Sequence, residues 1–132
     1  MIYDVIVIGG GPSGATAATE LAKLDHKVAF IDREGRIKPC GGAVPPRLIK
    51  DFQIPESQIV AKIKTARMIS PTARKVDIPI ENGYVGMVER ENFDEFLRAR
   101  AEESGAHRFT GTFLKINRQS KGNLVTVVFK DK

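Results

Sequence analysis

The feature that most constrains this chain is a glycine-rich turn that follows a short apolar run. Residues 3–8 read YDVIVI, a β-branched run that predicts a strand buried on both faces, as in a parallel sheet. Residues 9–14 follow as GGGPSG, which fits the pattern G-x-G-x-x-G. A helix to about Leu24 and a second strand over residues 27–31 complete a predicted βαβ unit.

Each residue of this turn has a physical task in binding a dinucleotide. Gly9 permits the tight turn out of the strand, and Gly11 lets the backbone approach a pyrophosphate. Gly14 allows the helix to lie close to the strand. Pro12 and Ser13 begin the helix, whose free N–H groups and dipole favour the phosphates.

An acidic residue at the end of the second strand is the other part of such a dinucleotide cradle. Asp32 lies there, directly after the apolar residues 28–31. Its carboxylate would accept a hydrogen bond from a free ribose hydroxyl and would repel a 2′-phosphate, which argues against NADP in this cradle. Physical reasoning alone leaves both NAD and FAD open.

Composition excludes several other classes of protein. The chain has 132 residues, enough for one modest core, and no apolar stretch is long enough to span a membrane. A secretory leader is not expected, because no basic segment precedes the first apolar run. Cys40 is the only cysteine, so no internal disulfide forms, and with two histidines far from it we expect no metal site.

The residues after the βαβ unit predict a mixture of short strands and helices. We divide the chain into the βαβ unit at residues 1–34, a loop with antiparallel strands at 35–89, and a helix with returning strands at 90–132. The second helix is expected at 91–103, because its apolar residues recur at helical spacing and Gly105 follows it. The other expected elements are a short helix at 47–52 and strands at 66–70, 76–80, 84–88, 108–116 and 123–130.

The net charge of +5 is unevenly spread: residues 107–132 carry six basic and one acidic side chain, and the middle stretch, residues 35–80, carries nine and three. Such a stretch can serve phosphates, nucleic acid or an acidic membrane surface. Phe52 is the only aromatic residue in this middle stretch, so we expect no nucleic-acid binding. The basic residues Arg36, Lys38, Arg47 and Lys50 are too sparse to choose between a diphosphate, a nicotinamide cofactor and a membrane.

Resemblance to known families selects the cofactor. Residues 3–14 resemble the opening of the FAD enzymes that include p-hydroxybenzoate hydroxylase. Three further segments are similar to the chlorophyll and bacteriochlorophyll geranylgeranyl reductases: REGRIKPCGGAVPP at 33–46, ARMISPT at 66–72 and GMVERENFDEFL at 86–97. The resemblance covers nearly all of the chain, and it implies an α/β fold. That fold is a Rossmann-like FAD-binding domain with a parallel sheet and antiparallel strands, truncated because members of this family are much longer.

The function that this resemblance implies is reduction of carbon–carbon double bonds. NADPH would reduce bound FAD, and the flavin would pass hydride to a geranylgeranyl group on chlorophyllide, on bacteriochlorophyllide or on a free diphosphate. Residues 35–89 would then be an incomplete substrate region. The protein would lie in the cytoplasm or peripherally on a photosynthetic membrane. The alternatives are a flavin-dependent aromatic monooxygenase and a non-catalytic fragment that binds FAD or NAD.

The same resemblance assigns tasks to residues outside the glycine turn. Arg90 would point to the FAD ribose or pyrophosphate, or else would be an exposed arginine paired with Glu89 or Glu91. The backbone of Cys40 and Gly41 would lie against the flavin, with the Cys40 thiol as a candidate catalytic group near the ring or substrate. The alternative for Cys40 is a small residue in a turn.

The adenosine half of the cofactor has its own candidates. Asp32 and Arg33 would flank the adenosine, and Leu114, beside Phe113, would offer backbone groups to the adenine. For Phe113 and Leu114 the alternative is simple sheet core.

Overall fold

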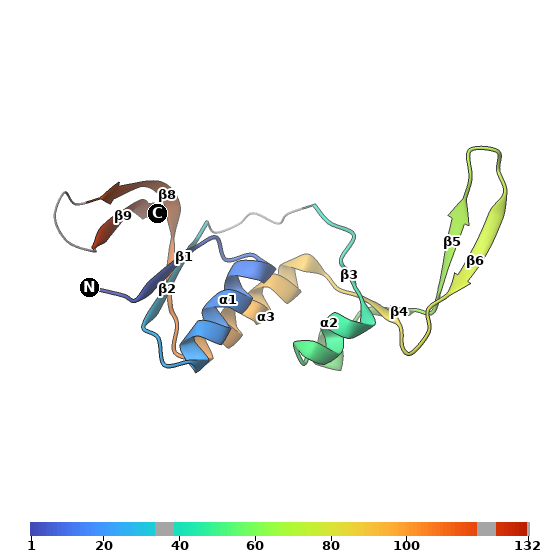
Figure 1. Ribbon diagram of the computed structural model, residues 1–132, viewed down its shortest axis with the longest axis horizontal. Helices are drawn as coiled ribbons and strands as arrows, with labels where there is room; N and C mark the ends of the chain where they lie inside the picture. Colours follow the sequence, from blue (N-terminus) through green and yellow to red (C-terminus); the bar gives the residue numbers. More distant parts are fainter. Residues whose placement is uncertain (34–38, 119–123, 132) are drawn as a thin grey trace. The chain divides into compact units, whose positions relative to one another are not determined.

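The computed structural model describes residues 1–33, 39–118 and 124–131, and it divides into two compact units (Figure 1). Unit 1 consists of Met1–Ile37 and Asp94–Lys132. Unit 2 consists of Lys38–Phe93.

Unit 1 is built on a four-stranded sheet with the order β1-β2-β8-β9. Its strands are β1 (Val5–Ile8), β2 (Val28–Asp32), β8 (His107–Arg118) and β9 (Val125–Asp131). The first three strands are parallel, with Ile8 opposite Ile31 and Asp32 opposite Thr110, and β9 returns antiparallel to β8. The predicted βαβ unit is therefore present, and its two strands are direct neighbours.

Two helices pack on one face of this sheet: α1 (Pro12–Lys23) and the C-terminal part of α3 (Arg90–Glu103) (Figure 1). Their contact is close because the facing residues are small. Ala18 of α1 and Ala101 of α3 are fully buried against Val28 and Phe30 of β2. Gly105, at φ +101, follows α3 and allows the chain to turn into β8.

The expectation that the first strand is buried on both faces is wrong. β1 is only half-buried, and Ile8 is 43% exposed. The physical reason is that β1 lies at the edge of the sheet, and α1 and α3 cover only one of its faces. β2, which has a neighbouring strand on each side, shows the expected burial at every position from Val28 to Ile31.

Unit 2 contains a small antiparallel sheet with the order β3-β7-β4, formed by Ala43–Val44, Val85–Met87 and Ala61–Ile63. The helix α2 (Pro46–Asp51) and a 3₁₀ turn (Glu56–Gln58) connect β3 to β4. Gly86 in the central strand leaves room for two isoleucines, because a Cβ there would lie 2.7 Å from the Ile59 side chain and 3.0 Å from that of Ile49.

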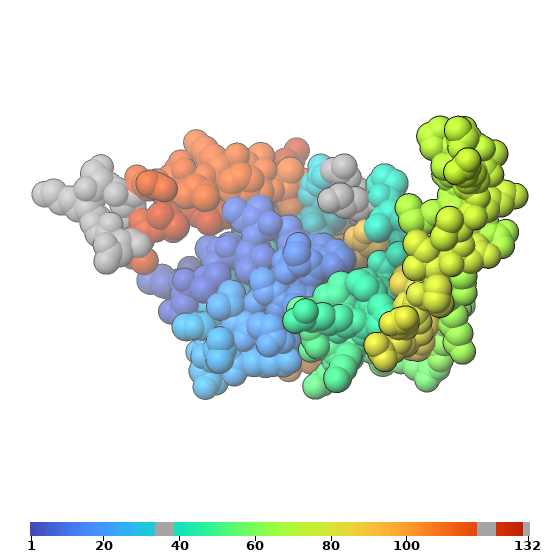
Figure 2. Space-filling model, turned by 45° about the vertical axis from the view of Figure 1, so that its right-hand side comes forward, coloured from blue at the N-terminus to red at the C-terminus, as the bar shows by residue number. Residues whose placement is uncertain are grey.

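The hairpin of unit 2 joins β5 (Thr65–Ile69) to β6 (Lys75–Pro79). Its turn is closed by a hydrogen bond from the Ser70 N–H to the Arg74 carbonyl oxygen at 2.9 Å. Every residue of both strands is exposed, and Figure 2 shows the hairpin's yellow-green atoms at the surface. The predicted strands 66–70, 76–80 and 84–88 are thus found within one or two residues, whereas the very short β3 and β4 were not predicted.

Candidate functional site

The glycine turn adopts the conformation that its sequence requires. Gly9 follows β1 at φ +105, a region that side chains other than glycine rarely adopt, and its N–H donates to the Ile31 carbonyl at 2.8 Å. A Cβ on Gly14 would collide with the Gly9 carbonyl oxygen. The start of α1 therefore lies directly on the turn, as the glycine pattern predicts.

The N-terminus of α1 is open in the way that a phosphate group needs. Gly11 is the N-cap residue, and a Cβ built on it would meet none of the described atoms within 4 Å. No side chain caps the helix, and its first turn has no acidic residue. Ser13 and Gly14 lie in the first helical turn, where backbone N–H groups lack intrahelical partners. These residues fit a pyrophosphate, which the helix dipole also favours.

Asp32 lies beside this turn, at the end of β2. It contacts the backbone of Gly10, because a Cβ on Gly10 would come within 2.8 Å of the Asp32 Cβ and 3.0 Å of its Oδ2. The structure thus brings together Gly9, Gly11, Pro12, Ser13, Gly14 and Asp32, the six predicted residues of the cradle.

Arg98 is part of this site, and sequence reasoning missed it. Its Nη2 donates to Asp32 Oδ2 at 2.8 Å, and its Nε donates to the Gly10 carbonyl oxygen at 2.8 Å. Arg98 follows Leu97, a buried residue of α3, and lies 66 residues after Asp32 in the chain. The only signal in the sequence is a charged residue at the border of an apolar helical stripe, which is a common surface feature.

The contacts of Arg98 continue into a chain of charges between α3 and β8. Glu95 accepts from Arg98 Nη1 at 3.2 Å and from Arg108 at 2.5 Å, and Arg108 also lies 3.5 Å from Glu102. The hydrogen bond from Arg108, with a smaller contribution from Arg98, lowers the pKa of Glu95. The same bond to Glu95 raises the pKa of Arg108. These ion pairs fix the last turns of α3 against the sheet.

The predicted residues Cys40, Gly41 and Arg90 belong to unit 2. Cys40 and Gly41 are exposed, and a Cβ on Gly41 would meet none of the described atoms within 4 Å. Gly42 is held tightly at φ +70, because its carbonyl accepts from the Val88 N–H at 2.9 Å and a Cβ there would collide with the Val88 carbonyl oxygen. Arg90 is the first residue of α3 and is half-buried.

The remaining predicted residues lie near the ends of the strands or outside the described part of the chain. Arg33 follows β2 directly and is exposed. Leu114 lies in β8 at an irregularity of the pairing with β9, and it is 56% exposed, so it is not part of the sheet core of this chain. Arg36 and Lys38 lie outside the described residues.

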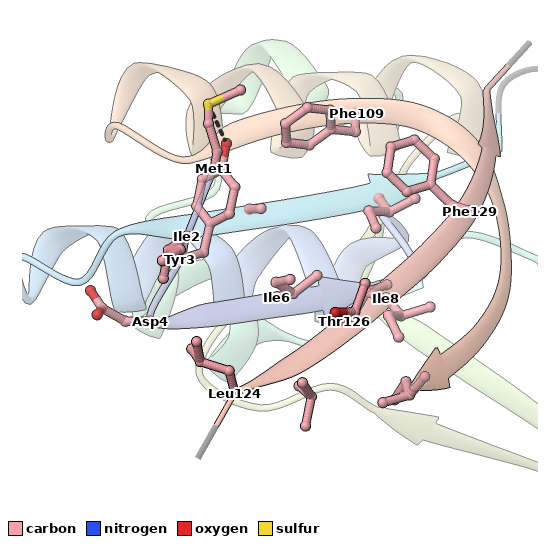
Figure 3. Close-up of a pocket in the computed structure, with 15 residues that line it drawn as sticks. Met1, Ile2, Tyr3, Asp4, Ile6, Ile8, Phe109, Leu124, Thr126 and Phe129 are labelled. Carbon is pink, nitrogen blue, oxygen red and sulfur yellow. Dashed lines mark hydrogen bonds between the residues drawn. The ribbon is translucent and has the colours of Figure 1, made fainter. Parts of the chain in front are cut away.

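A hollow of about 600 Å³ lies on the face of the sheet opposite the helices (Figure 3). Ile6 and Ile8 of β1, Phe109 of β8 and Phe129 of β9 line it, together with Ala29 and Ile31 of β2 and the N-terminal residues. Most of its lining residues are apolar, although Tyr3, Asp4 and Thr126 also line it. No helix in the described ranges is long and apolar enough to cross a membrane, and those ranges hold no cluster of three potential metal ligands.

Comparison with known proteins gives consistent results. Residues 3–126 match the model of the pyridine nucleotide-disulphide oxidoreductase family. The geranylgeranyl diphosphate reductase of Rhodobacter capsulatus is 64% identical over the whole chain, which spans 33% of that protein. The chloroplastic geranylgeranyl diphosphate reductase of Arabidopsis thaliana is 44% identical over 86% of the chain, which spans 25% of that protein.

A solved structure shares the fold. The geranylgeranyl bacteriochlorophyll reductase-like protein of Thermoplasma acidophilum matches with a TM-score of 0.80 and 30% identity, over 89% of this chain and 32% of that protein. The predicted fold class, a Rossmann-like domain of the FAD-binding oxidoreductase type with parallel and antiparallel strands, is confirmed. With a family match over nearly all of its residues and a cradle that has the required geometry, the chain belongs to the pyridine nucleotide-disulphide oxidoreductase family.

Proposed function

We propose that this chain is the FAD-binding part of a reductase that uses NADPH to reduce double bonds of a geranylgeranyl group. The observation that carries the proposal is the 64% identity, over every residue of the chain, to a protein named geranylgeranyl diphosphate reductase. The chain spans only about a third of that relative, so the activity belongs to the longer protein. An aromatic monooxygenase is disfavoured, because the relatives of 40% identity and above carry the reductase name.

In this proposal unit 1 binds the adenosine diphosphate half of FAD. The open N-terminus of α1 at Gly11, Pro12 and Ser13 receives the pyrophosphate, and Asp32 accepts a hydroxyl of the ribose. Arg33 and the backbone near Leu114 lie against the adenosine. Bound FAD supplies hydride transfer between NADPH and the carbon–carbon double bond, while the protein binds and orients the reactants.

Unit 2 supplies the flavin side of the proposal. Gly41 has open space where a side chain would be, which suits close approach by a flat ring, and the rigid Gly42 holds the preceding backbone in place. The exposed thiol of Cys40 is then a candidate for contact with the ring or substrate. Arg90 reaches the FAD ribose or pyrophosphate, and residues 35–89 contribute an incomplete substrate region.

The acceptor in this proposal is a prenylated pigment or an isoprenoid diphosphate, and no nucleic acid takes part. The names of the relatives favour the geranylgeranyl group itself as the part that is recognised. The protein would act in the cytoplasm or at the periphery of a photosynthetic membrane, where such pigments are made.

The direct test is the purified protein that contains this chain. We expect it to be yellow and to release FAD on denaturation. With NADPH it should add two hydrogens per reduced double bond to geranylgeranyl diphosphate, geranylgeranyl-chlorophyllide or geranylgeranyl-bacteriochlorophyllide, as measured by mass spectrometry. Parallel assays with NADH test the reductant. Absence of flavin, or flavin without reduction of any of the three acceptors, would contradict the proposal.

A further inference from the structure

One side chain ties the two halves of the cradle together. Arg98 Nε donates to the carbonyl oxygen of Gly10 at 2.8 Å, and Arg98 Nη2 donates to Asp32 Oδ2 at 2.8 Å. Because the guanidinium group is planar and rigid, these two bonds set the position of the carboxylate relative to the glycine turn. The third contact, from Nη1 to Glu95, holds the arginine itself in place.

The ion pair between Arg98 and Asp32 is the one described pair of unit 1 in which both side chains are less than one quarter exposed. The Arg98 side chain is 15% exposed and that of Asp32 is 24% exposed, whereas both partners of the Lys23–Glu20 pair are 56% exposed. Partly buried charges are screened less by salt and lose less side-chain freedom on pairing than surface charges do. The contact is therefore suited to a lasting structural role.

The geometry at Asp32 leaves one side of the carboxylate for a ligand. Oδ2 is held by Arg98, and the structure records no hydrogen bond from a described residue to Oδ1. Gly10 lies beside the same carboxylate, since a Cβ built on Gly10 would come within 3.0 Å of Asp32 Oδ2. An acceptor that is oriented in advance binds a hydroxyl donor without the cost of ordering it first.

From these contacts we propose that Arg98 is a positioning residue of the cofactor site. It orients the Asp32 carboxylate so that the second oxygen accepts a hydroxyl of the adenosine ribose, and it thereby sets the affinity for the adenosine half of the cofactor. The proposal deepens the FAD-binding function proposed above and rests on it.

The first test measures FAD affinity in the protein that contains this chain, by quenching of flavin fluorescence. Arg98→Met should weaken FAD binding roughly tenfold or more, because a charge-assisted contact to the ribose acceptor is lost. Arg108→Met is the matched control, since it removes the same positive charge from a neighbouring arginine. Arg108 contacts Glu95 and Glu102 but neither Asp32 nor Gly10. It should change the affinity by no more than roughly twofold.

The second test separates positioning from general support of the fold. In an Asp32→Ala background, Arg98→Met should cause little further loss of FAD affinity, because the carboxylate that it orients is gone. The preference for FAD over its 2′-deoxyadenosine analogue should also shrink in Arg98→Met and stay unchanged in Arg108→Met. Full additivity of the two substitutions, or an unchanged preference, would overturn the proposal.

The outcomes distinguish this inference from the proposed function. Failure of the unsubstituted protein to bind FAD would remove the FAD-binding function itself. FAD binding that is equal in Arg98→Met and Arg108→Met would remove only the role of Arg98. Should Arg98→Met not fold, as judged by circular dichroism, Arg98→Lys keeps the charge but not the fork. Arg98→Lys should then bind FAD more weakly than the unsubstituted protein does. Equal FAD affinity in the two proteins would also overturn the proposal.

Discussion

At the scale of single residues, the three glycines of the fingerprint do different physical work. Gly9 has a positive φ, Gly14 has no space for a side chain, and Gly11 has an ordinary φ of −72° with open space around it. Backbone conformation therefore explains why residue 9 is a glycine, and close packing explains why residue 14 is one. Only Gly11 has no internal reason to be glycine, which is what a position reserved for a ligand should show.

Alanine substitutions at Gly14 and Gly11 separate a role in packing from a role in ligand binding. Gly14→Ala should lower the free energy of unfolding by about 1–3 kcal/mol, because the new Cβ collides with the Gly9 carbonyl. Gly11→Ala should change it by less than about 1 kcal/mol yet weaken FAD binding, since the new methyl group occupies the space for the pyrophosphate. Urea unfolding and FAD titration measure the two effects. A Gly11→Ala protein that binds FAD normally would contradict the placement of the phosphates.

Cys40 provides a second test at this scale. We expect Cys40→Ala in the protein that contains this chain to retain FAD and to lose reductase activity, because the substitution removes the exposed thiol that would contact the ring or substrate. Flavin content is measured by absorbance and turnover by consumption of NADPH. Cys40→Ser serves as the control for size. Normal turnover in Cys40→Ala would leave the thiol without a chemical role.

At the scale of elements, the long amphipathic segments were predictable and the shortest strands were not. Helix α1 ends at Lys23, one residue before the predicted end, and α3 begins at Arg90, one residue before the predicted start. Both carry an apolar stripe of several turns. The strands β3 and β4 have two and three residues, which is too short for an alternating pattern to be recognised.

The charge chain between α3 and β8 makes the stability of this packing depend on pH. The pKa of Glu95 is lowered in the folded state, chiefly by the hydrogen bond from Arg108. A carboxyl group with a lowered folded pKa contributes stability above its unfolded pKa, and this contribution is lost as the pH falls through the folded pKa. Stability from Glu95 should therefore be present at neutral pH and vanish in acid.

Substitution of Glu95 tests this dependence. Glu95→Gln should lower the free energy of unfolding at neutral pH by less than about 1 kcal/mol, a small effect because the Glu95 side chain is half-exposed. The difference from the unsubstituted protein should shrink as the pH falls into the acid range. Glu103→Gln is the control, since it lies on the same helix and has no ion pair with a described residue. Urea unfolding at several pH values measures both, and a difference independent of pH would contradict the assignment.

At the scale of the whole molecule, the sheet of unit 1 has helices on one face only. The other face carries the hollow lined by Ile6, Ile8, Phe109 and Phe129 (Figure 3). Two strands, β1 and β9, lie at the edges of the sheet. Apolar surface and open strand edges both favour association with another chain.

We therefore expect the isolated 132-residue chain to self-associate or to be of low stability. Ile8→Ser should weaken the association roughly tenfold, because it removes an apolar side chain from the hollow. Leu24→Ser is the control, since Leu24 is also an exposed apolar residue but does not line the hollow. Sedimentation velocity over a range of concentrations measures the association. A monomer with a sharp, concentration-independent thermal transition would contradict this expectation.

The amino-acid sequence by itself determined the parts of this protein that depend on neighbours along the chain. The strand, the glycine turn, α1 and the position of Asp32 follow from local pattern and spacing, because backbone conformation and helix capping are decided within a few residues. The family resemblance could be recognised from the sequence for the same reason, because short contiguous motifs carry it.

Only the tertiary structure decided which distant residues complete the cradle and which surfaces stay open. Arg98 reaches Asp32 and Gly10 because α3 packs beside α1, a contact between segments that are far apart in sequence. The half-exposed state of β1 likewise depends on which strands and helices cover it, and not on its own apolar residues. The sequence pattern of a segment shows which of its side chains can be buried. Which other residues those side chains contact depends on how all the segments pack together.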